Sequence, residues 1–405
     1  MINEERLLLH LAELAKIGST PEGGVNRFSF TAEEMVANLY IKQLMEAAGM
    51  TVSTDAIGNI IGEVNSHIDA PAIVLGSHID TVPNGGHYDG ALGVLSAIEV
   101  IHTLQDNNIL LKRPVKVIAF KDEEGTRFQF GMIGSRAAAG TLQLEELQRT
   151  DEEGISIAEA MQQDGLDAAN VADAKLSNVE CYVELHIEQG KVLEKAGVGV
   201  GVVTGIAGPL WQQITLTGTA EHAGATPMAL RQDALVGASL IIAKIEELAR
   251  QYPAAVATVG KLSVSPNGVN VIPGEVTFTV DIRDIEEEVR NVLEQEIHHA
   301  AQAIAQERQL TLSIETLQRV APVKCDAEIQ QIIAQAIEDN GQQVVHLPSG
   351  AGHDAMQFNG QFPVAMIFVR SKDGISHNPK EFTSAEDIIT GANVLKQTLL
   401  ELDQK

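Results

Sequence analysis

The sequence predicts an α/β protein whose largely parallel sheet is covered by helices on both faces, with an inserted α+β domain. Apolar runs typical of buried strands alternate with helical patterns in both terminal parts of the chain. Between them, residues 209–321 follow the order strand, helix, strand, strand, helix, strand, which is that of a ferredoxin-like sandwich. The chain is therefore divided into a main domain, residues 1–208 and 322–405, and an inserted domain, residues 209–321.

Apolar runs define the expected strands of the main domain, and amphipathic patterns define its helices. The strands are expected at Ile73–Leu75, Val115–Phe120, Tyr182–Leu185 and Val364–Val369. Helices are expected at Glu4–Ile17, after the capping residue Thr31, and at Gly90–Leu104. Strand and helix alternate, as in sheets with helices on both faces.

The inserted domain has shorter, more polar strands. Its strands are expected at Gln213–Thr217, Thr258–Val264, Glu275–Ile282 and Leu310–Leu317, and its helices at Arg231–Gln251 and Glu286–Glu307. The first helix carries an apolar stripe through Leu235, Ala238, Ile242 and Ile245. About 110 residues are enough for a core of their own.

Charge and composition exclude some classes of partner. The 405 residues include 28 Lys and Arg against 55 Asp and Glu, a formal charge of −27. Nucleic-acid binding needs a surplus of basic residues, and an anionic membrane surface would repel this chain, so neither is expected as a partner. With 44% hydrophobic residues the chain has ample material for folded cores.

Cysteines and the N-terminal segment favour a cytoplasmic protein. Cys181 and Cys325 have no C-x-x-C spacing, which argues against a disulfide scaffold or a zinc knuckle. The first residues do not combine a basic region with an apolar one, as a signal peptide would. No uninterrupted apolar run reaches the ~18 residues of a membrane span.

Histidine and acidic residues stand at or just beyond the ends of the four main-domain strands, and this is the strongest functional signal. Ligands of open α/β sheets collect at the carboxyl ends of strands. His78 follows the first strand, Glu123 and Glu124 the second, and His186 the third, while His377 lies in the loop after the fourth. We therefore expect these side chains to meet at one edge of the sheet.

Each residue has an alternative explanation when it is taken alone. His78 is either a metal ligand, supported by Asp80 two residues later, or a hydrogen-bonded core histidine. Asp89 stands where a helix N-cap is expected, but its carboxylate is also suited to bridge two cations. Glu123 and Glu124 form either a solvated charged face or a ligand beside a general base.

Taken together, His78, Asp89, Glu124, His186 and His377 supply two imidazole–carboxylate sets that share one aspartate. Such a count suits a two-metal site with ions ~3.5–4 Å apart. Nitrogen and oxygen ligands favour zinc, manganese or cobalt.

A resemblance to a known family supports this interpretation. The matching runs are, in order, GSHIDTVPNGGHYDGALG, FKDEEGTRF, GMIGSR, YVELHIEQG, GTAEHAGATPM, GVNVIPGEV, DIRD, LPSGAGHDA and FVRSKDGISHNP. Across essentially the whole chain, the sequence resembles the N-carbamoyl-L-amino-acid hydrolases and the similar allantoate amidohydrolases. These enzymes are the ureido-cleaving branch of the di-zinc exopeptidase and aminoacylase group.

The resemblance implies a role for each matching residue. The implied metal ligands are His78, Asp89, Glu124, His186 and His377, with Asp89 bridging two divalent ions, Glu123 as the general base and Asp80 orienting His78. The implied substrate-binding residues are Gln189, His222, Asn270, Arg283 and the backbone at Gly352, with His222 reaching the site of the opposite subunit. The inserted domain is implied to form a homodimer and to act as a lid.

The residues of the inserted domain also have structural alternatives. Arg283 is suited to hold a substrate carboxylate bidentately, but it is equally able to pair on the surface with Asp281 or Asp284. His222 lies among small residues that permit close approach to a ligand, and otherwise is a turn histidine. Asn270 otherwise caps a loop.

These observations predict a metal-dependent hydrolase that cleaves the ureido C–N bond of N-carbamoyl-L-amino acids, releasing the L-amino acid, carbon dioxide and ammonia. The near alternative is allantoate, whose carboxylate and ureido groups suit the same residues. A more distant alternative is a peptidase or N-acyl-amino-acid hydrolase with the same metal centre. From another class, a non-catalytic metal-dependent binding protein is disfavoured because Glu123 and the whole ligand set are present.

Overall fold

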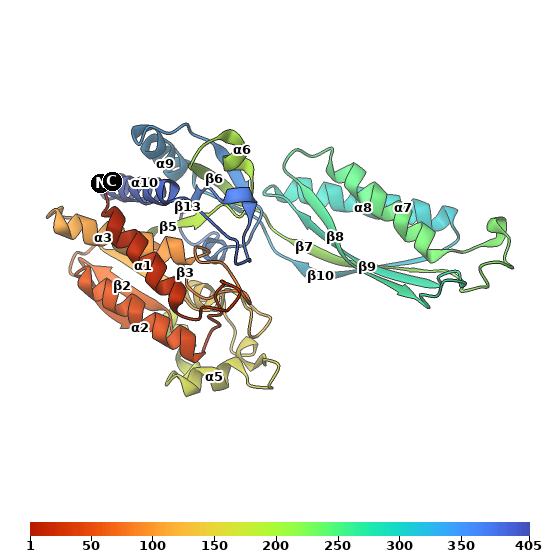
Figure 1. The fold of residues 1–405 in the computed structure, drawn as a ribbon, viewed down its shortest axis with the longest axis horizontal. Coiled ribbons are helices and arrows are strands. Elements are labelled where there is room, and N and C mark those ends of the chain that lie inside the picture. The colour runs from red at the N-terminus through yellow and green to blue at the C-terminus, as the bar shows by residue number, and fades with distance from the viewer. The chain divides into compact units, whose positions relative to one another are not determined.

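The computed structural model describes all residues from Met1 to Lys405, and they form two compact units. The first unit contains Met1–Thr204 and Cys325–Lys405, and the second contains Gly205–Lys324. The chain therefore leaves the first unit once and returns to complete it, as the colours of Figure 1 show.

A mixed sheet forms the centre of the first unit, with strand order β1-β2-β4-β3-β5-β13-β6-β11 and β12 paired to β6. The short strand β11 and the last two residues of β6 fall within the residues assigned to the second unit. The four central strands β4, β3, β5 and β13 are parallel, whereas β1, β2, β6 and β11 join in antiparallel fashion. The strands are β1 Thr51–Thr54, β2 Ile60–Val64, β3 Ala72–His78, β4 Val115–Phe120, β5 Val179–Ile187, β6 Val200–Ile206, β11 Val323–Lys324, β12 His346–Ser349 and β13 Val364–Val369. The prediction of a largely parallel α/β sheet is confirmed for its centre, and the antiparallel margins were not predicted.

Helices pack on the sheet around an apolar core. They are α1 Glu4–Lys16, α2 Ala32–Ala47, α3 Ala91–Asp106, α4 Ile133–Ala139, α5 Ile157–Gln163, α6 Val192–Ala196, α9 Ala327–Asp339 and α10 Ala385–Leu402. Helix α3 is buried almost all round, because it lies between the sheet and the helices α1 and α10. Side-chain caps begin several helices, including Thr31 at α2 and Ser384 at α10. Helices α4 and α5 belong to a separate, smaller core.

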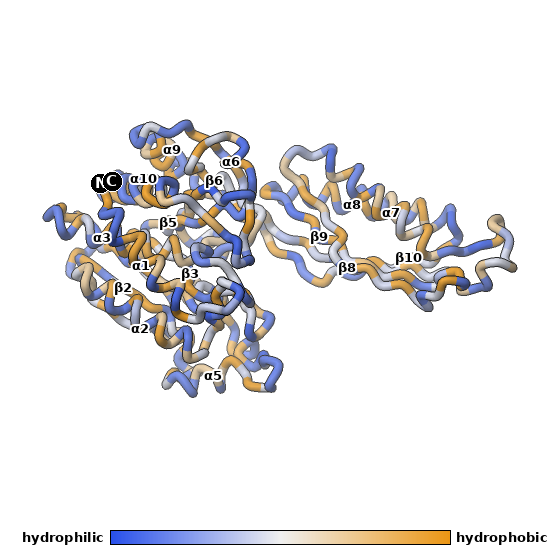
Figure 2. Tube along the Cα trace, in the orientation of Figure 1, coloured by the Kyte–Doolittle hydropathy of each residue, from blue (hydrophilic) through white to orange (hydrophobic).

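The central strands are buried, and this burial holds the residues at their carboxyl ends in place. Every residue of β3 and of β13 is buried, and Figure 2 shows the hydrophobic colour concentrated along the core of this unit. Each fully buried Val, Leu or Ile side chain contributes roughly 1.5–3 kcal/mol relative to exposure. The ends of these strands are therefore rigid supports for the residues that follow them.

The second unit is a four-stranded antiparallel sheet with two helices on one face. Its order is β7 Leu210–Thr217, α7 Ala234–Ala249, β8 Val256–Ser265, β9 Glu275–Arg283, α8 Glu287–Glu307 and β10 Thr311–Arg319. The sheet order is β10-β7-β9-β8. Inward residues such as Val276, Phe278 and Val280 on β9 pack against α7 and α8, and the alternation of colours along both helices is visible in Figure 2. The lid and dimerisation role of residues 209–321 stays a prediction.

None of the helices combines the length and the apolar character that crossing a lipid bilayer requires.

Candidate metal centre and active site

Side chains from five segments of the first unit meet beyond the carboxyl ends of β3, β4 and β5. His78 is the last residue of β3, His186 lies near the end of β5, and Glu124 follows β4. Asp89 precedes α3, and His377 lies in the loop after β13. Four groups of side chains have potential ligand atoms within 4.8 Å of one another, and three of them consist of these residues: His78, Asp89 and His186; His78, Glu123 and Glu124; and Asp89, Glu124 and His377.

Asp89 occupies the middle of this arrangement, and its two oxygens face different histidines. Oδ1 lies 3.0 Å from Nε2 of His186 and 3.7 Å from Nε2 of His78. Oδ2 lies 3.3 Å from Nε2 of His377. A carboxylate in this position is suited to bridge two cations, one on each side.

The two buried histidines present Nε2 to the centre because their other ring nitrogen is occupied. Nδ1 of His78 lies 3.2 Å from the main-chain oxygen of Asp80, and Nδ1 of His186 lies 2.9 Å from that of Ile187. Such contacts set the tautomer that leaves Nε2 as a ligand atom.

The carboxylate of Asp80 has a different principal contact from the one expected. Its Oδ1 is 3.5 Å from Nδ1 of His78, at the outer limit of hydrogen bonding. Its two oxygens instead accept hydrogen bonds from the backbone N–H groups of Glu123 and Glu124, at 3.1 and 3.0 Å. Asp80 therefore fixes the glutamate pair and contacts His78 mainly through its main chain.

The two glutamates are directed toward different histidines. Oε2 of Glu123 lies 3.8 Å from Nε2 of His78, whereas Oε1 of Glu124 lies 3.4 Å from Nε2 of His377. Burial raises the pKa of Glu123 well above its ordinary value. Burial and the charge of Asp89 raise the pKa of Glu124 to about 7. Asp89 itself stays ionised, because His186 and His377 outweigh burial and hold its pKa well below the ordinary value.

The donor set fits divalent cations. Asp80 and Asp89 are buried and the side chains of Glu123 and Glu124 are only 9% exposed, and the ion pairs of all four are formed with imidazoles alone. Concentrated negative charge of this kind is unfavourable in a low-dielectric site unless cations offset it. Imidazole nitrogens and carboxylate oxygens are ligands typical of zinc, manganese and cobalt.

Three residues at or beside the centre adopt a backbone conformation that is unfavourable for residues with a side chain. Asp122, Gln189 and His377 adopt positive φ values of 55°, 56° and 54°, a conformation that costs non-glycine residues on the order of 1–3 kcal/mol. Gly90 also has a positive φ, and a Cβ there would lie 2.4 Å from Nε2 of His78. Strain retained beside a candidate site is typical of residues selected for function.

Two of the predicted substrate-binding residues belong to the first unit. Nε2 of Gln189 donates to Oδ2 of Asp89 at 2.8 Å, while its buried Oε1 accepts no hydrogen bond. That oxygen is available to a donor group of a ligand. Gly352 lies in the loop after β12, next to His353, whose ring packs edge-on against His186 with centroids 4.5 Å apart.

The other three predicted residues belong to the second unit and do not gather at one place within it. His222 and Asn270 are exposed and lie side by side, since the N–H of Ala223 donates to the carbonyl of Asn270 at 3.0 Å. Arg283 ends β9, and its guanidinium bonds the carboxylate of Asp281 at 2.7–3.1 Å. Asn270 precedes the start of β9, so the strand separates it from Arg283 by roughly 27 Å at ~3.3 Å per residue.

A comparison with protein families matches residues 74–401 to the peptidase family M20/M25/M40. The chain belongs to this family. The family is metal-dependent, in agreement with the clustered ligand atoms described above.

Similar proteins extend over the whole chain. The N-carbamoyl-L-amino acid amidohydrolase of Geobacillus stearothermophilus is 50% identical over 407 residues, covering 100% of both chains. The allantoate amidohydrolase of Bacillus subtilis is 36% identical, covering 96% of this chain and 95% of that protein. The crystal structure of an amidase of the hydantoinase/carbamoylase family from Burkholderia multivorans has a TM-score of 0.94 at 38% identity, covering 100% and 98% of the two chains.

Several buried polar residues that lie beside the candidate metal ligands were not identified from the sequence. Glu184, on β5, accepts hydrogen bonds from the hydroxyls of Ser77 and Tyr182 and from the N–H of Ala355. Its lone pairs are therefore largely used, which argues against a ligand role although it lies close to His186 and His353. The strand alternation would have indicated it, because Glu184 and His186 are two residues apart on one face.

Glu381 was also missed. Its buried carboxylate contacts the backbone of Tyr88 and Asp89 and the hydroxyl of Ser376. Nothing in the local pattern around Glu381 indicates this, because its partners on the Asp89 side are almost 300 positions away.

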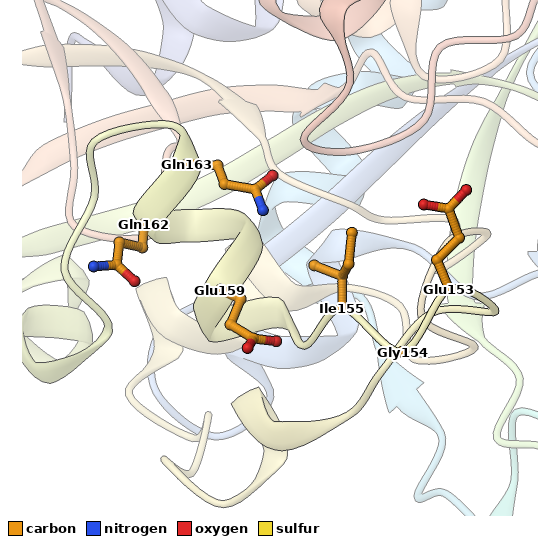
Figure 3. Close-up of a pocket in the computed structure, with 6 residues that line it drawn as sticks. All are labelled: Glu153, Gly154, Ile155, Glu159, Gln162 and Gln163. Atoms are coloured by element: carbon orange, nitrogen blue, oxygen red, sulfur yellow. The ribbon is translucent and has the colours of Figure 1, made fainter.

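Surface hollows differ in their relation to the centre. A hollow of about 960 Å³ borders Glu124 and is lined by Phe28, Phe30, Pro83 and Arg127, among others. A smaller one of about 330 Å³, shown in Figure 3, lies beside α5 and contains none of the predicted site residues. Its Glu159 forms the capping box of α5 with Ser156, which is a structural role. Only the larger hollow is adjacent to the candidate ligands.

Proposed function

We propose that this chain is a di-metal amidohydrolase that cleaves the ureido C–N bond of N-carbamoyl-L-amino acids. The products are the L-amino acid, carbon dioxide and ammonia. The observation that carries the proposal is the clustering of His78, Asp89, Glu124, His186 and His377 around one buried centre, with Glu123 beside it. The 50% identity to a protein named N-carbamoyl-L-amino acid amidohydrolase supports the substrate class.

The proposed metal ligands divide into two sets that share Asp89. His78 and His186 face Oδ1, whereas His377 and Glu124 lie on the side of Oδ2. When bound, two divalent ions such as zinc, manganese or cobalt lower the pKa of a water and polarise the carbamoyl oxygen.

Glu123 is the proposed general base. It accepts the proton of the attacking water as the bond to the carbamoyl carbon forms, and it returns that proton to the departing ammonia. The remaining carbamate then loses carbon dioxide. Burial raises the pKa of Glu123 above its ordinary value, the direction that favours return of the proton to a leaving group.

The proposed substrate residues require two chains. Arg283 and Asn270 are proposed to hold the α-carboxylate and to select the L-enantiomer, and His222 to stabilise the developing oxyanion. Within the second unit β9 separates Arg283 from the other two by roughly 27 Å at ~3.3 Å per residue, which is too far for one small substrate. We therefore propose a homodimer in which His222 and Asn270 serve the partner's site.

The second unit is proposed to act as the lid and dimerisation domain. Its sheet has the strands β10 and β8 at its edges, and an edge strand gives a physical route to dimers by sheet extension. Closure of the lid would exclude water and complete the site. We further propose a cytoplasmic location, consistent with free, buried Cys181 and Cys325.

Allantoate is the second candidate substrate. The specific observation in its favour is the 36% identity to the allantoate amidohydrolase of Bacillus subtilis over 96% of this chain. Allantoate carries a carboxylate and two ureido groups, so Arg283 and the metal centre would be used in the same way.

The deciding experiment measures ammonia release with added manganese or zinc. The substrates are N-carbamoyl-L-methionine, its D-enantiomer, allantoate and a dipeptide, and Glu123→Gln is the control for background hydrolysis. We expect rapid release from the L-carbamoyl compound alone. Preference for allantoate would select the second candidate, and no release from any substrate with metals bound would overturn the proposal.

A further inference from the structure

We propose that Glu381 is a positioning residue that holds the two loops carrying Asp89 and His377, and so controls the affinity for the cation these two ligands share. The inference rests on the metal centre of the proposed function. It concerns one of the two cation positions, and it assigns a role to a buried carboxylate that does not itself serve as a ligand.

His377 differs from the other proposed ligands in how weakly it is enclosed. Its side chain is 48% exposed, whereas those of His78, His186 and Asp89 are at most 7% exposed. Its backbone also has a φ of 54°, which is unfavourable for a residue with a side chain. An exposed ligand on a strained loop needs neighbouring contacts to hold its direction.

Glu381 supplies these contacts from a buried position, being 5% exposed. Oε1 accepts the N–H groups of Tyr88 and Asp89 at 2.8 and 3.1 Å. Oε2 accepts the hydroxyl of Ser376, the neighbour of His377, at 2.9 Å. One carboxylate therefore ties together two loops that are far apart in the sequence, each of which presents a ligand.

The hydroxyl of Ser376 connects the two carboxylates directly. It lies 2.8 Å from Oδ2 of Asp89 and 2.9 Å from Oε2 of Glu381. A hydroxyl has one proton and can donate it to only one of them at a time. A cation on Oδ2 of Asp89 would displace the Ser376 hydroxyl from that oxygen, so the hydroxyl would donate to Glu381 instead. Cation binding and the hydrogen bond between Ser376 and Glu381 would therefore stabilise each other.

Gly86 shows how closely the first loop is packed against this carboxylate. A Cβ on Gly86 would lie 2.0 Å from Cδ and Oε1 of Glu381, and the three heavy atoms nearest to it all belong to that side chain. Gly86→Ala therefore displaces Glu381 without removing it. Glu381 itself belongs to none of the groups of side chains whose ligand atoms lie close enough together to hold a metal ion.

The test is a metal titration of the metal-free, full-length protein with Mn²⁺, Zn²⁺ or Co²⁺ alone, followed by calorimetry or equilibrium dialysis. We expect two equivalents in the wild type. In Glu381→Ala we expect the weaker equivalent to lose roughly 10–100-fold in affinity while the tighter one is unchanged, the range found for residues that orient metal ligands. Glu381→Gln keeps an oxygen for both N–H groups, so we expect it to restore part of the loss.

The matched control is Asp403→Ala. Asp403 is also buried, and its carboxylate accepts the N–H groups of Lys112 and Arg113, but it does so before the first residue of β4, at the end of the strand away from the metal centre. We expect Asp403→Ala to lower the Tm but to bind both metal equivalents with the affinity of the wild type. Equal metal losses in E381A and D403A would reduce the role of Glu381 to general stability and overturn the inference.

A double-mutant cycle keeps the inference testable if E381A folds poorly. We expect G86A alone to weaken the same equivalent about 10-fold, and to add little in the E381A background, because the clashing side chain is then absent. Full additivity of the two losses, or normal binding of both equivalents by E381A, would overturn the inference alone. Failure of the wild type to bind two equivalents would overturn the proposed metal centre as well.

Discussion

The candidate residues of the two units differ in how they are held. In the first unit most of the proposed site residues lie at or just beyond the ends of buried strands, and backbone or carboxylate contacts set their direction; His377, which is 48% exposed, is the exception. In the second unit His222 and Asn270 are exposed, and Nδ1 of His222 is bonded only by the N–H groups of its own loop, Gly224 and Ala225.

This difference suggests that the first unit binds the cations and transfers the proton, whereas the second unit contacts the substrate or a second chain. A preorganised, buried set of donors is what cation binding and proton transfer need. Exposed residues on loops are suited to meet something that arrives from outside, either substrate or a second chain. Substitutions in the first unit should therefore reduce turnover, with loss of metal where a ligand is changed, and substitutions of Arg283 and Asn270 in the second should mainly raise KM.

The largest effect is expected for Asp89→Asn. An amide offers one neutral oxygen where the carboxylate offers two charged ones to both cations, so we expect turnover to fall on the order of 10⁴-fold and metal content to drop. Ammonia release and elemental analysis check this. The matched control is the exposed carboxylate Asp69, whose change to Asn should leave both unchanged, and turnover above a tenth of wild type in D89N would contradict the bridging role.

Glu123→Gln comes next. We expect kcat to fall roughly 10²–10⁴-fold, with KM within a few-fold of wild type and both metal equivalents retained, because the base acts on the proton and not on the cations. Steady-state kinetics together with metal analysis separate this result from that of D89N. Near-normal turnover with metals bound would remove Glu123 from the mechanism.

Arg283→Lys tests the second unit. A lysine keeps the charge but loses bidentate pairing, so we expect kcat/KM to fall about 10–100-fold, mostly through KM. Metal content and Tm should not change. Arg319→Lys is the matched control, because Arg319 pairs with Glu294 on the same unit; equal effects of both variants would contradict a substrate-binding role of Arg283.

The sequence predicted the first unit best where local pattern alone decides the structure. The strands Val115–Phe120 and Val364–Val369 have the bounds expected from their apolar runs, because strands buried on both faces are almost continuously apolar, with Lys116 as the one polar residue of these two. Helix α2 begins after Thr31 as predicted, since the capping hydroxyl accepts the N–H of Glu34.

What depends on distant partners was not predictable. Strand β1, with residues such as Thr51 and Ser53, is polar and largely exposed, and only its pairing with β2 makes it a strand. The contact of Asp80 with the backbone of Glu123 likewise depends on the register of β3 and β4. The strand-end rule placed the proposed ligands near one another, but the hydrogen bonds that direct them come from the tertiary fold.

The last prediction concerns stability, and it tests whether the burial of acidic residues in the first unit makes the free energy of unfolding depend on pH. Asp354 is fully buried, and its carboxylate accepts no hydrogen bond, since the neighbouring Ser135 hydroxyl donates instead to the carbonyl of Met132. Burial, together with the charge of Glu184, raises the pKa of Asp354 from 3.8 to about 8. The folded state therefore holds this proton more tightly than the unfolded state, and the associated stability is present at low pH and is lost as the pH rises through 8.

Asp354→Asn is neutral at every pH and similar in shape, so it isolates this group. In metal-free protein we expect the free energy of unfolding of Asp354→Asn, relative to that of the wild type, to increase by about 1 kcal/mol for each pH unit between pH 5 and 8. Above pH 8 this difference should stay constant. Urea unfolding at a series of pH values measures the difference. A difference that stays constant over this range would mean that Asp354 is ionised inside the fold, and that the first unit tolerates a buried, unpaired charge even without cations.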